Sequence, residues 1–265
     1  MDAARNRLAE LMLRSPVRFG SLRGVPFVGK WIHKLSHRLL PADGLVWTQI
    51  RNGPAKGTWL ELNPRTSRNY AEGEVERPVQ GALAEYLKPG MVFYDLGANI
   101  GFFSLLASRL VEKTGMVFSF EPDPVAAIRL RRNVERNVAS NVSVVEAGVG
   151  ATTGEFAFLC ADSTSPDRGL GSFAKGGEKC PDEALPCYAL DDFVLEFPPP
   201  DAIKCDVEGA EGQVILGARN LLATRRPWIL FEIHSAANGS EVKNFCRGLA
   251  YELRDVDGNH LLAEP

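Results

Sequence analysis

Apolar and polar residues follow two different patterns along this chain, and the change between them falls near residue 91. Before that point, apolar residues spaced at helical intervals predict three helices, over residues 2–14, 28–40 and 73–87. Two short apolar runs separated by a glycine-containing turn predict a β-hairpin, with strands at residues 45–50 and 58–62. We therefore interpret residues 1–69 as an N-terminal extension made of helices and a hairpin, and residues 70–265 as the main domain.

From residue 91 onward, short apolar runs alternate with amphipathic segments. The runs predict strands over residues 91–95, 116–121, 142–147, 201–206, 228–234, 251–255 and 260–263. The amphipathic segments predict helices over residues 100–112, 124–139, 210–223 and 240–249. Apolar strands that alternate with helices form a mostly parallel sheet with helices on both faces, so the pattern predicts an α/β domain. Such sheets bind ligands at the carboxyl ends of their strands, which directs the search for a site there.

Residues 161–184 interrupt this alternation with a stretch rich in glycine, serine, proline and charge. A long loop within a compact domain is often functional, so we interpret this one as a lid. Ser172 and Phe173 are its candidate contacts to a bound ligand.

Charge is spread unevenly over a chain whose net charge is only −3. Residues 1–60 hold ten Lys and Arg against three Asp and Glu, a balance of +7, which leaves −10 for the remainder. The basic extension is either a solvated surface or an arm that meets an anionic membrane, a phosphate-bearing substrate or a second copy of the chain. The acidic remainder does not favour nucleic-acid binding.

Several features indicate a cytoplasmic protein without a structural metal. The sequence has no signal peptide and no apolar run of about 18 residues, so no transmembrane helix is predicted. Its five cysteines include no CxxC pair, which predicts reduced thiols rather than disulfides or zinc ligands. His33 and His37 have the i, i+4 spacing of metal ligands on a helix, but no further ligand accompanies them.

The strongest motif, DLGANIGF, runs from Asp95 to Phe102 between a predicted strand and a predicted helix. Glycine at positions 97 and 101 lets the backbone turn tightly and approach a ligand. A dinucleotide-binding loop would read GxGxxG, but Asn99 takes the place of its second glycine. The sequence instead matches the D/E-x-G-x-x-x-G loop of class I methyltransferases. Glu121, 24 residues beyond Gly97, ends the next strand and is placed to accept hydrogen bonds from ribose hydroxyls.

Five segments together resemble the FkbM-type methyltransferase family. They are residues 92–104 (VFYDLGANIGFFS), 119–124 (SFEPDP), 190–193 (LDDF), 203–211 (IKCDVEGAE) and 228–234 (WILFEIH). The resemblance covers roughly residues 70–265. It implies a class I methyltransferase Rossmann-like fold with a seven-stranded sheet whose last strand is antiparallel.

The same resemblance implies methyl transfer from S-adenosyl-L-methionine, usually to a hydroxyl of a natural product, sugar or glycolipid. The acceptor is thus expected to be a small molecule or a lipid-linked one. The cofactor residues implied by the motifs are Asp95, Gly97, Asn99, Gly101, Phe102, Glu121, Pro122, Ala147 and Asp206.

Candidate catalytic residues end the strands that follow the cofactor motif. Asp206 and Glu208 close a predicted buried strand, where two acids are costly without a task. His234 ends the next strand, is the only histidine expected near the cleft, and serves as a base or as an orienting group. Glu211 reads as an acid at a helix N-terminus. Asp206, Glu208 and His234 could together hold a divalent cation, but no dense cluster demands one and we predict no metal.

Three other functions remain open on the sequence alone. The same machinery could methylate nitrogen instead of oxygen. A nucleotide-dependent oxidoreductase would bind NAD(H), which Asn99 disfavours. A non-catalytic cofactor-binding protein would not need Asp206, Glu208 and His234.

Overall fold

The computed structural model describes residues 44–159, 172–173 and 184–265. The chain divides into two compact units, Met1–Val75 and Glu76–Pro265. The helices predicted over 2–14 and 28–40, with His33 and His37, lie outside the described residues, and so does most of the predicted lid. The domain boundary predicted between residues 69 and 70 stays a prediction.

In the first unit, the predicted hairpin is confirmed. Strand β1 (Val46–Gln49) pairs antiparallel with β2 (Trp59–Leu62), and a short helix, α3 (Arg68–Glu72), follows. Gly73 ends this helix with φ 71°, a left-handed conformation that glycine adopts readily. The helix predicted over residues 73–87 is therefore wrong at its start, because Gly73 terminates one helix and does not begin the next.

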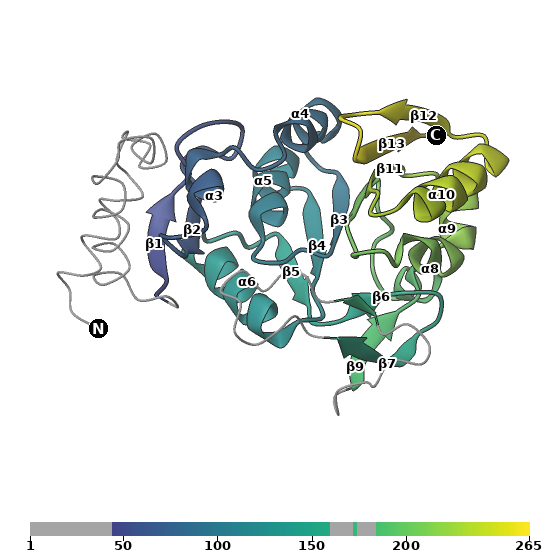
Figure 1. Ribbon diagram of the computed structural model, residues 1–265, viewed down its shortest axis with the longest axis horizontal. Coiled ribbons are helices and arrows are strands. Elements are labelled where there is room, and N and C mark those ends of the chain that lie inside the picture. Colours follow the sequence, from purple (N-terminus) through teal and green to yellow (C-terminus); the bar gives the residue numbers. More distant parts are fainter. Residues whose placement is uncertain (1–43, 160–171, 174–183) are drawn as a thin grey trace, which may run out of the picture. The chain divides into compact units, whose positions relative to one another are not determined.

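The second unit is built on a seven-stranded sheet (Figure 1). Its strands are β3 (Val92–Leu96), β4 (Met116–Phe120), β5 (Val142–Val145), β10 (Ala202–Cys205), β11 (Trp228–Glu232), β12 (Glu252–Asp255) and β13 (His260–Glu264). The spatial order is β5-β4-β3-β10-β11-β13-β12. The five neighbouring strands β5, β4, β3, β10 and β11 are parallel to one another. Strand β13 runs antiparallel to both β11 and β12. The mostly parallel seven-stranded sheet of a class I methyltransferase fold is confirmed.

Helices cover both faces of this sheet. Neighbouring side chains of a strand point to opposite faces, so each strand contacts helices on both sides. Asp95 of β3 faces a helix on one side, where it accepts a hydrogen bond from Ser104. Tyr94 faces the other side, where its ring packs edge-on against Phe193 at a centroid distance of 5.6 Å. The helices are α4 (Arg77–Tyr86), α5 (Phe102–Val111), α6 (Pro124–Arg136), α7 (Leu190–Phe193), α8 (Glu211–Leu216), α9 (Arg219–Thr224) and α10 (Ala236–Gly248).

A second, smaller sheet was not predicted. It contains β6 (Gly148–Val149), β7 (Gly154–Leu159), β8 (Ser172–Phe173) and β9 (Ala184–Tyr188), in the order β6-β9-β7-β8. The strand predicted over residues 142–147 is wrong at its end, since β5 stops at Val145 and Gly148 pairs with β9. Ser172 and Phe173 lie in a paired strand, so the interpretation of residues 161–184 as loop alone is also wrong.

Two helix boundaries differ from the pattern for local reasons. The helix predicted over residues 210–223 is two helices, α8 and α9, separated at Gly217. A Cβ atom at Gly217 would lie 2.0 Å from the Gly150 carbonyl oxygen, so the two backbones touch here. Helix α10 begins at Ala236, before the predicted residue 240, because the Ser235 hydroxyl accepts the Asn238 N–H and caps it.

Two further observations concern the described residues only. None of their helices is long and apolar enough to cross a membrane. Cys187, Cys205 and Cys246 are buried free thiols.

Candidate active site

The loop from Asp95 to Phe102 leaves the carboxyl end of β3 through two glycines in left-handed conformations. Gly97 has φ 77° and Gly101 has φ 87°. A Cβ atom at position 97 would lie 1.8 Å from the carbonyl oxygen of Asp206, and one at position 101 would lie 2.3 Å from Leu130 Cδ1. Asn99 also has a positive φ, 49°. The sequence spacing thus reflects a loop folded tightly against its neighbours.

Asp95 lies at the base of this loop, with 0% of its surface exposed. Its Oδ2 accepts a hydrogen bond from the Ser104 hydroxyl at 2.5 Å, and Ser104 in turn accepts one from Ser119 at 2.8 Å. Among the described residues, its Oδ1 has no hydrogen-bond partner. Burial raises the pKa of Asp95, and nearby Lys204 opposes that rise. A buried acceptor without a partner fits a cationic or donor group of a ligand.

Glu121 ends β4 beside the same loop. Its Oε2 accepts the backbone N–H of Asn99 at 2.7 Å, and its Oε1 accepts that of Asp123 at 2.8 Å. Burial raises the pKa of Glu121 to about 7. Because each carboxylate oxygen has two lone pairs, both retain capacity to accept a ribose hydroxyl.

The remaining predicted cofactor residues follow neighbouring strands. Pro122 is half-buried after β4, while Ala147 is buried after β5. Phe102 is buried at the start of α5, where its ring packs against Phe103. Since β3, β4 and β5 are adjacent and parallel, these residues share one edge of the sheet with Asp95 and Glu121.

The acidic residues that follow β10 face this loop from the next strand. Lys204 is buried within β10, opposite Asp95 in register, and its Nζ donates to Asp206 Oδ2 at 2.9 Å. Burial alone would lower the pKa of Lys204, but Asp206, Asp95 and Glu76 together raise it above its usual value. Strand β10 ends at Cys205, and Glu208 lies beyond it with φ 53°.

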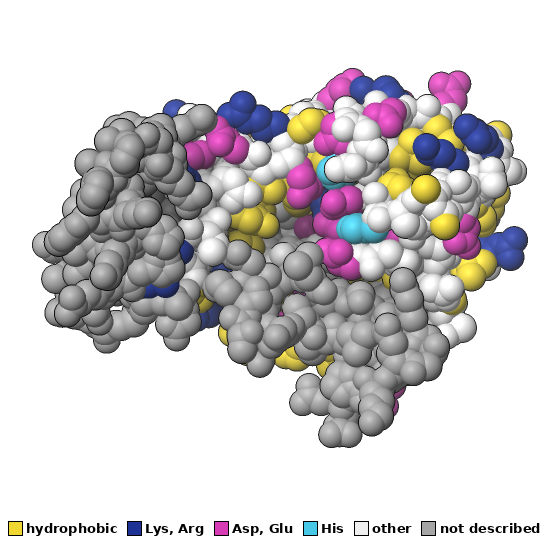
Figure 2. Space-filling model, viewed as in Figure 1, with side chains coloured by type: hydrophobic (Ala, Val, Ile, Leu, Met, Phe, Trp, Pro, Cys, Tyr) yellow, Lys and Arg dark blue, Asp and Glu magenta, His cyan; other side chains and the backbone are white. Residues whose placement is uncertain are grey.

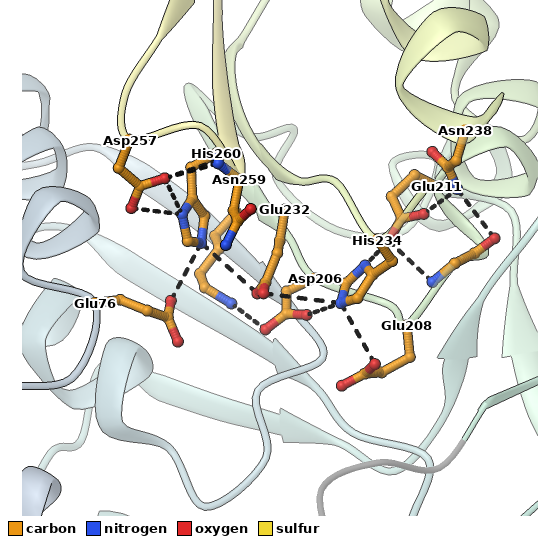
Figure 3. Close-up of polar contacts among 12 residues, drawn as sticks. Glu76, Asp206, Glu208, Glu211, Glu232, His234, Asn238, Asp257, Asn259 and His260 are labelled. Atoms are coloured by element: carbon orange, nitrogen blue, oxygen red, sulfur yellow. Dashed lines mark hydrogen bonds and ion pairs between the residues drawn. The ribbon is translucent and has the colours of Figure 1, made fainter. Parts of the chain in front are cut away.

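His234 lies in the middle of these acids (Figure 3). Its Nε2 lies 3.4 Å from Glu208 Oε2 and 3.6 Å from Asp206 Oδ1. Its Nδ1 lies 3.0 Å from Glu211 Oε1. The hydrogen bond with Glu211 is the main cause that raises the pKa of His234 to about 9. The structure thus brings the three predicted catalytic residues together.

Glu211 does more than open a helix, which is how the sequence pattern was interpreted. It is 0% exposed and accepts hydrogen bonds from the Gly209 N–H and the Asn238 side-chain amide. These donors fix the carboxylate, and the carboxylate in turn fixes the His234 ring. Glu211 is therefore a positioning residue for His234.

A second histidine was missed by the sequence analysis, which expected only His234 near the cleft. His260 begins β13 and lies opposite Glu232 in the antiparallel register with β11. Its Nδ1 is 2.9 Å from Asp257 Oδ1. Burial alone would lower the pKa of His260, but the surrounding carboxylates raise it to about 10. Figure 2 shows histidine side chains surrounded by Asp and Glu on this face. The antiparallel register of β13 with β11 was the signal needed to find it.

An open groove of about 420 Å³ lies beside His234, at the N-terminal end of α10. It is lined by Ile233, His234, Ser235, Ala236, Gly239, Ser240, Lys243 and Gly258. Hydroxyls and one ammonium group dominate its polar lining, so it suits a polar ligand.

Comparisons with known proteins found methyltransferases similar to this chain. AglP, a hexuronic acid methyltransferase of Haloferax volcanii, is 28% identical over 173 residues, which are 63% of this chain and 66% of AglP. The 31-O-demethyl-FK506 methyltransferase FkbM of Streptomyces tacrolimicus is 36% identical over 117 residues, 42% of this chain and 40% of that protein. The chain thus spans less than two thirds of the length of these relatives. A crystal structure of methyltransferase FkbM from Methylobacillus flagellatus aligns with TM-score 0.49 and 20% identity, covering 70% of this chain and 50% of that one.

Residues 95–256, well over half of the chain, match the sequence profile described as the methyltransferase FkbM domain. The match begins at Asp95 and includes Glu121, Asp206, Glu208 and His234. This chain belongs to the FkbM methyltransferase family.

Proposed function

We propose that this protein transfers a methyl group from S-adenosylmethionine to a hydroxyl oxygen of a sugar or natural product. The proposal rests on two clusters of side chains that lie at the carboxyl ends of neighbouring strands of the sheet. On one side lies a buried Asp95 oxygen without a partner, next to Glu121; on the other lies His234 among Asp206 and Glu208.

The residues present fit the cofactor by their chemistry. Asp95 Oδ1 offers an acceptor for the ammonium group of the amino-acid tail, and Glu121 offers acceptors for the ribose hydroxyls. Ala147 and Gly148 supply small buried positions after β5 for the adenine. When bound, the cofactor supplies a methyl group already activated by the positive sulfonium.

The protein's own task is alignment and removal of one proton. Alignment of nucleophile and methyl carbon can supply about 7–11 kcal/mol of the barrier. When the acceptor oxygen takes the methyl group, its hydroxyl proton would pass to Nε2 of neutral His234, a form that gains population as the pH rises toward the pKa of about 9. Glu211 on Nδ1 stabilises the imidazolium, while Asp206 and Glu208 face Nε2.

Binding of the cofactor is the first test. Calorimetry should show micromolar binding of S-adenosylmethionine and S-adenosylhomocysteine, no binding of NADH, and weaker adenosyl binding by Glu121→Ala. Tighter binding of NADH than of either adenosyl ligand would instead support the oxidoreductase. His234→Ala should keep cofactor affinity and lower kcat by about 10²–10⁴-fold. An unchanged kcat would remove His234 from the base role.

For the acceptor, we propose a sugar and begin with a hexuronic acid, because AglP is a hexuronic acid methyltransferase. The groove beside His234 supports this choice, because Lys243 can pair with a carboxylate while Ser235 and Ser240 meet hydroxyls. Lys243→Ala should raise KM for a uronic acid and leave KM for the neutral hexose unchanged. Arg247→Ala, on the same helix but outside the groove, is the matched control. Equal effects of Lys243→Ala on both sugars would exclude the carboxylate contact.

The remaining predictions concern the protein's surroundings. We keep as proposals a cytoplasmic location, contact of the basic residues 1–60 with an anionic membrane, and a homodimer. The charge distribution supports the membrane contact, five cysteines without a CxxC pair support the cytoplasmic location, and the apolar faces of the helices predicted from residues 2–14 and 28–40 support the homodimer. Nitrogen as the methyl acceptor is distinguished by the product formed in the acceptor screen.

A further inference from the structure

Glu76, Glu232 and His260 form a group beside the proposed base that the methyl-transfer scheme does not use. They come from the start of α4, the end of β11 and the start of β13. One nitrogen of His260 and one carboxylate oxygen from each acid lie within 4.8 Å of one another. Figure 3 shows the three side chains pointing toward a common point.

The imidazole of His260 is buried and aimed into this group without a hydrogen bond on its inner nitrogen. Only 5% of the residue is exposed. Its Nε2 lies 3.5 Å from Glu76 Oε2 and 3.7 Å from Glu232 Oε2, and among the described residues it has no hydrogen-bond partner. Glu76 Oε2 is likewise buried and without a hydrogen bond. Buried polar atoms are nearly always hydrogen-bonded, whereas these two meet only in an ion pair at 3.5 Å, longer than a normal hydrogen bond, which leaves both able to bind a further partner.

The outer nitrogen of His260 is held in the way that metal-binding histidines are held. Asp257 Oδ1 lies 2.9 Å from Nδ1 and also accepts the backbone N–H groups of Asn259 and His260. A carboxylate on Nδ1 fixes the ring and makes Nε2 a better ligand, which is the usual outer shell of a metal-bound histidine.

Charge also favours a cation at this point. Three carboxylates, those of Glu76, Glu232 and Asp257, surround His260, while the Lys204 ammonium is shared with Asp206 and Asp95 as well as with Glu76. A proton on His260 offsets one of the three negative charges, whereas a dication bound to neutral His260 offsets two.

The distances between His260 Nε2 and the two carboxylates match those between ligands of one metal ion. Two ligand atoms each about 2.1 Å from one ion at a tetrahedral angle lie about 3.4 Å apart. The observed 3.5 and 3.7 Å from His260 Nε2 to the two acids are close to this separation. One imidazole and two carboxylates suit Mn²⁺ or Zn²⁺ better than a soft, thiolate-seeking metal.

We propose that Glu76, Glu232 and His260 bind one divalent metal ion, Mn²⁺ or Zn²⁺. The sequence analysis predicted no metal and did not single out Glu76 or His260. Glu232 Oε1 also lies 3.9 Å from His234 Nε2, so the ion lies one carboxylate away from the proposed base. Asp206, Glu232 and His234 form a second group of similar composition, and the test distinguishes the two.

The experiment is a titration of the chelator-stripped full chain with Mn²⁺, in which loss of the free-ion electron paramagnetic resonance signal reports binding. The wild type should bind one Mn²⁺ per chain, in competition with Zn²⁺. Asp257→Asn, which removes the carboxylate that holds His260, should weaken Mn²⁺ binding by about 10–100-fold. Glu76→Gln and His260→Gln each remove a direct ligand and should weaken it by at least as much. His234→Gln is the matched control and should bind Mn²⁺ like the wild type.

Circular dichroism checks that each variant is folded. Glu76 is only half-buried, so Glu76→Gln still tests the proposal if His260→Gln does not fold. Absence of Mn²⁺ and Zn²⁺ binding by the wild type at millimolar concentration would overturn the proposal and leave His260 as a buried imidazolium. So would loss of binding in His234→Gln with retention in Glu76→Gln, since the ion would then belong to the other group.

Discussion

The Glu121 carboxylate holds the cofactor loop and is also expected to hold the ribose. It accepts the Asn99 and Asp123 N–H groups, and burial raises its pKa to about 7. Protonation removes acceptor capacity from a group that needs four lone pairs. Its ionised form therefore dominates above pH 7 and is lost as the pH falls through that value.

We expect the affinity for S-adenosylmethionine to fall as the pH is lowered from 8 to 6, with a midpoint near the pKa of about 7. Calorimetry across this range measures it. Glu121→Gln should bind weakly at pH 8 and show little pH dependence. A wild-type affinity that stays flat between pH 6 and pH 8 would exclude ionised Glu121 as the ribose acceptor.

Gly97 and Gly209 allow steric contact to be separated from backbone strain. Both have positive φ, 77° and 97°, but an added Cβ meets the Asp206 carbonyl oxygen at 1.8 Å at position 97 and nothing within 4 Å at position 209. Alanine in a left-handed conformation costs about 1–2 kcal/mol at either site. Overpacking adds about 1–3 kcal/mol at Gly97 alone.

Gly97→Ala should therefore lower the free energy of unfolding by more than Gly209→Ala does, by about 1–3 kcal/mol. Urea denaturation followed by circular dichroism measures both. Equal losses in the two variants would mean that the loop moves away from Asp206 at little cost.

Among the secondary-structure elements, the LDDF segment shows how a family motif can be structural. Asp191 accepts the backbone N–H groups of Asn220 and Leu221 and so caps α9, whose own N-cap position is Ala218. Phe193 is buried and stacks on Phe197 at a ring-centroid distance of 4.3 Å. The motif therefore stabilises the face of the sheet opposite Asp95.

Asp191→Ala should reduce the free energy of unfolding by about 0.5–2 kcal/mol, the usual cost of a lost helix cap. Asp192→Ala is the matched neighbour: this exposed residue accepts a hydrogen bond from the Thr153 hydroxyl and caps no helix. Thermal unfolding compares the two. A larger loss for Asp192→Ala would contradict the capping role.

The elements that sequence could predict are those specified by nearby residues. The Asp95–Phe102 loop and the strands around it follow from apolar runs and glycine spacing. His260 could not be found in this way, because its place depends on the antiparallel register of β13 with Glu232. Glu211 was recognised as a helix acid, but its contact with His234 depends on the packing of α8 beside β11. The small sheet was missed because β6 and β8 have only 2 residues each and β9 contains Pro186.

At the level of the chain, all of the predicted cofactor and catalytic residues lie within the unit Glu76–Pro265. A fragment of residues 70–265 should thus bind S-adenosylmethionine with an affinity within a few-fold of the full chain, as measured by calorimetry. Retained binding with lost methyl transfer would assign the first unit to the acceptor. Lost binding in a fragment that remains folded would show that cofactor recognition needs the first unit.

The contact between Gly97 and the Asp206 carbonyl has a consequence for chimeric enzymes. The two residues are 109 positions apart in the sequence, yet no side-chain atom fits between their backbones. A recombination crossover placed between them would join a cofactor loop from one parent to an acid loop from another. Parents whose backbones differ here by an ångström would give a clash or a gap. Productive crossovers therefore fall outside residues 97–206, and those two loops are inherited as a single block.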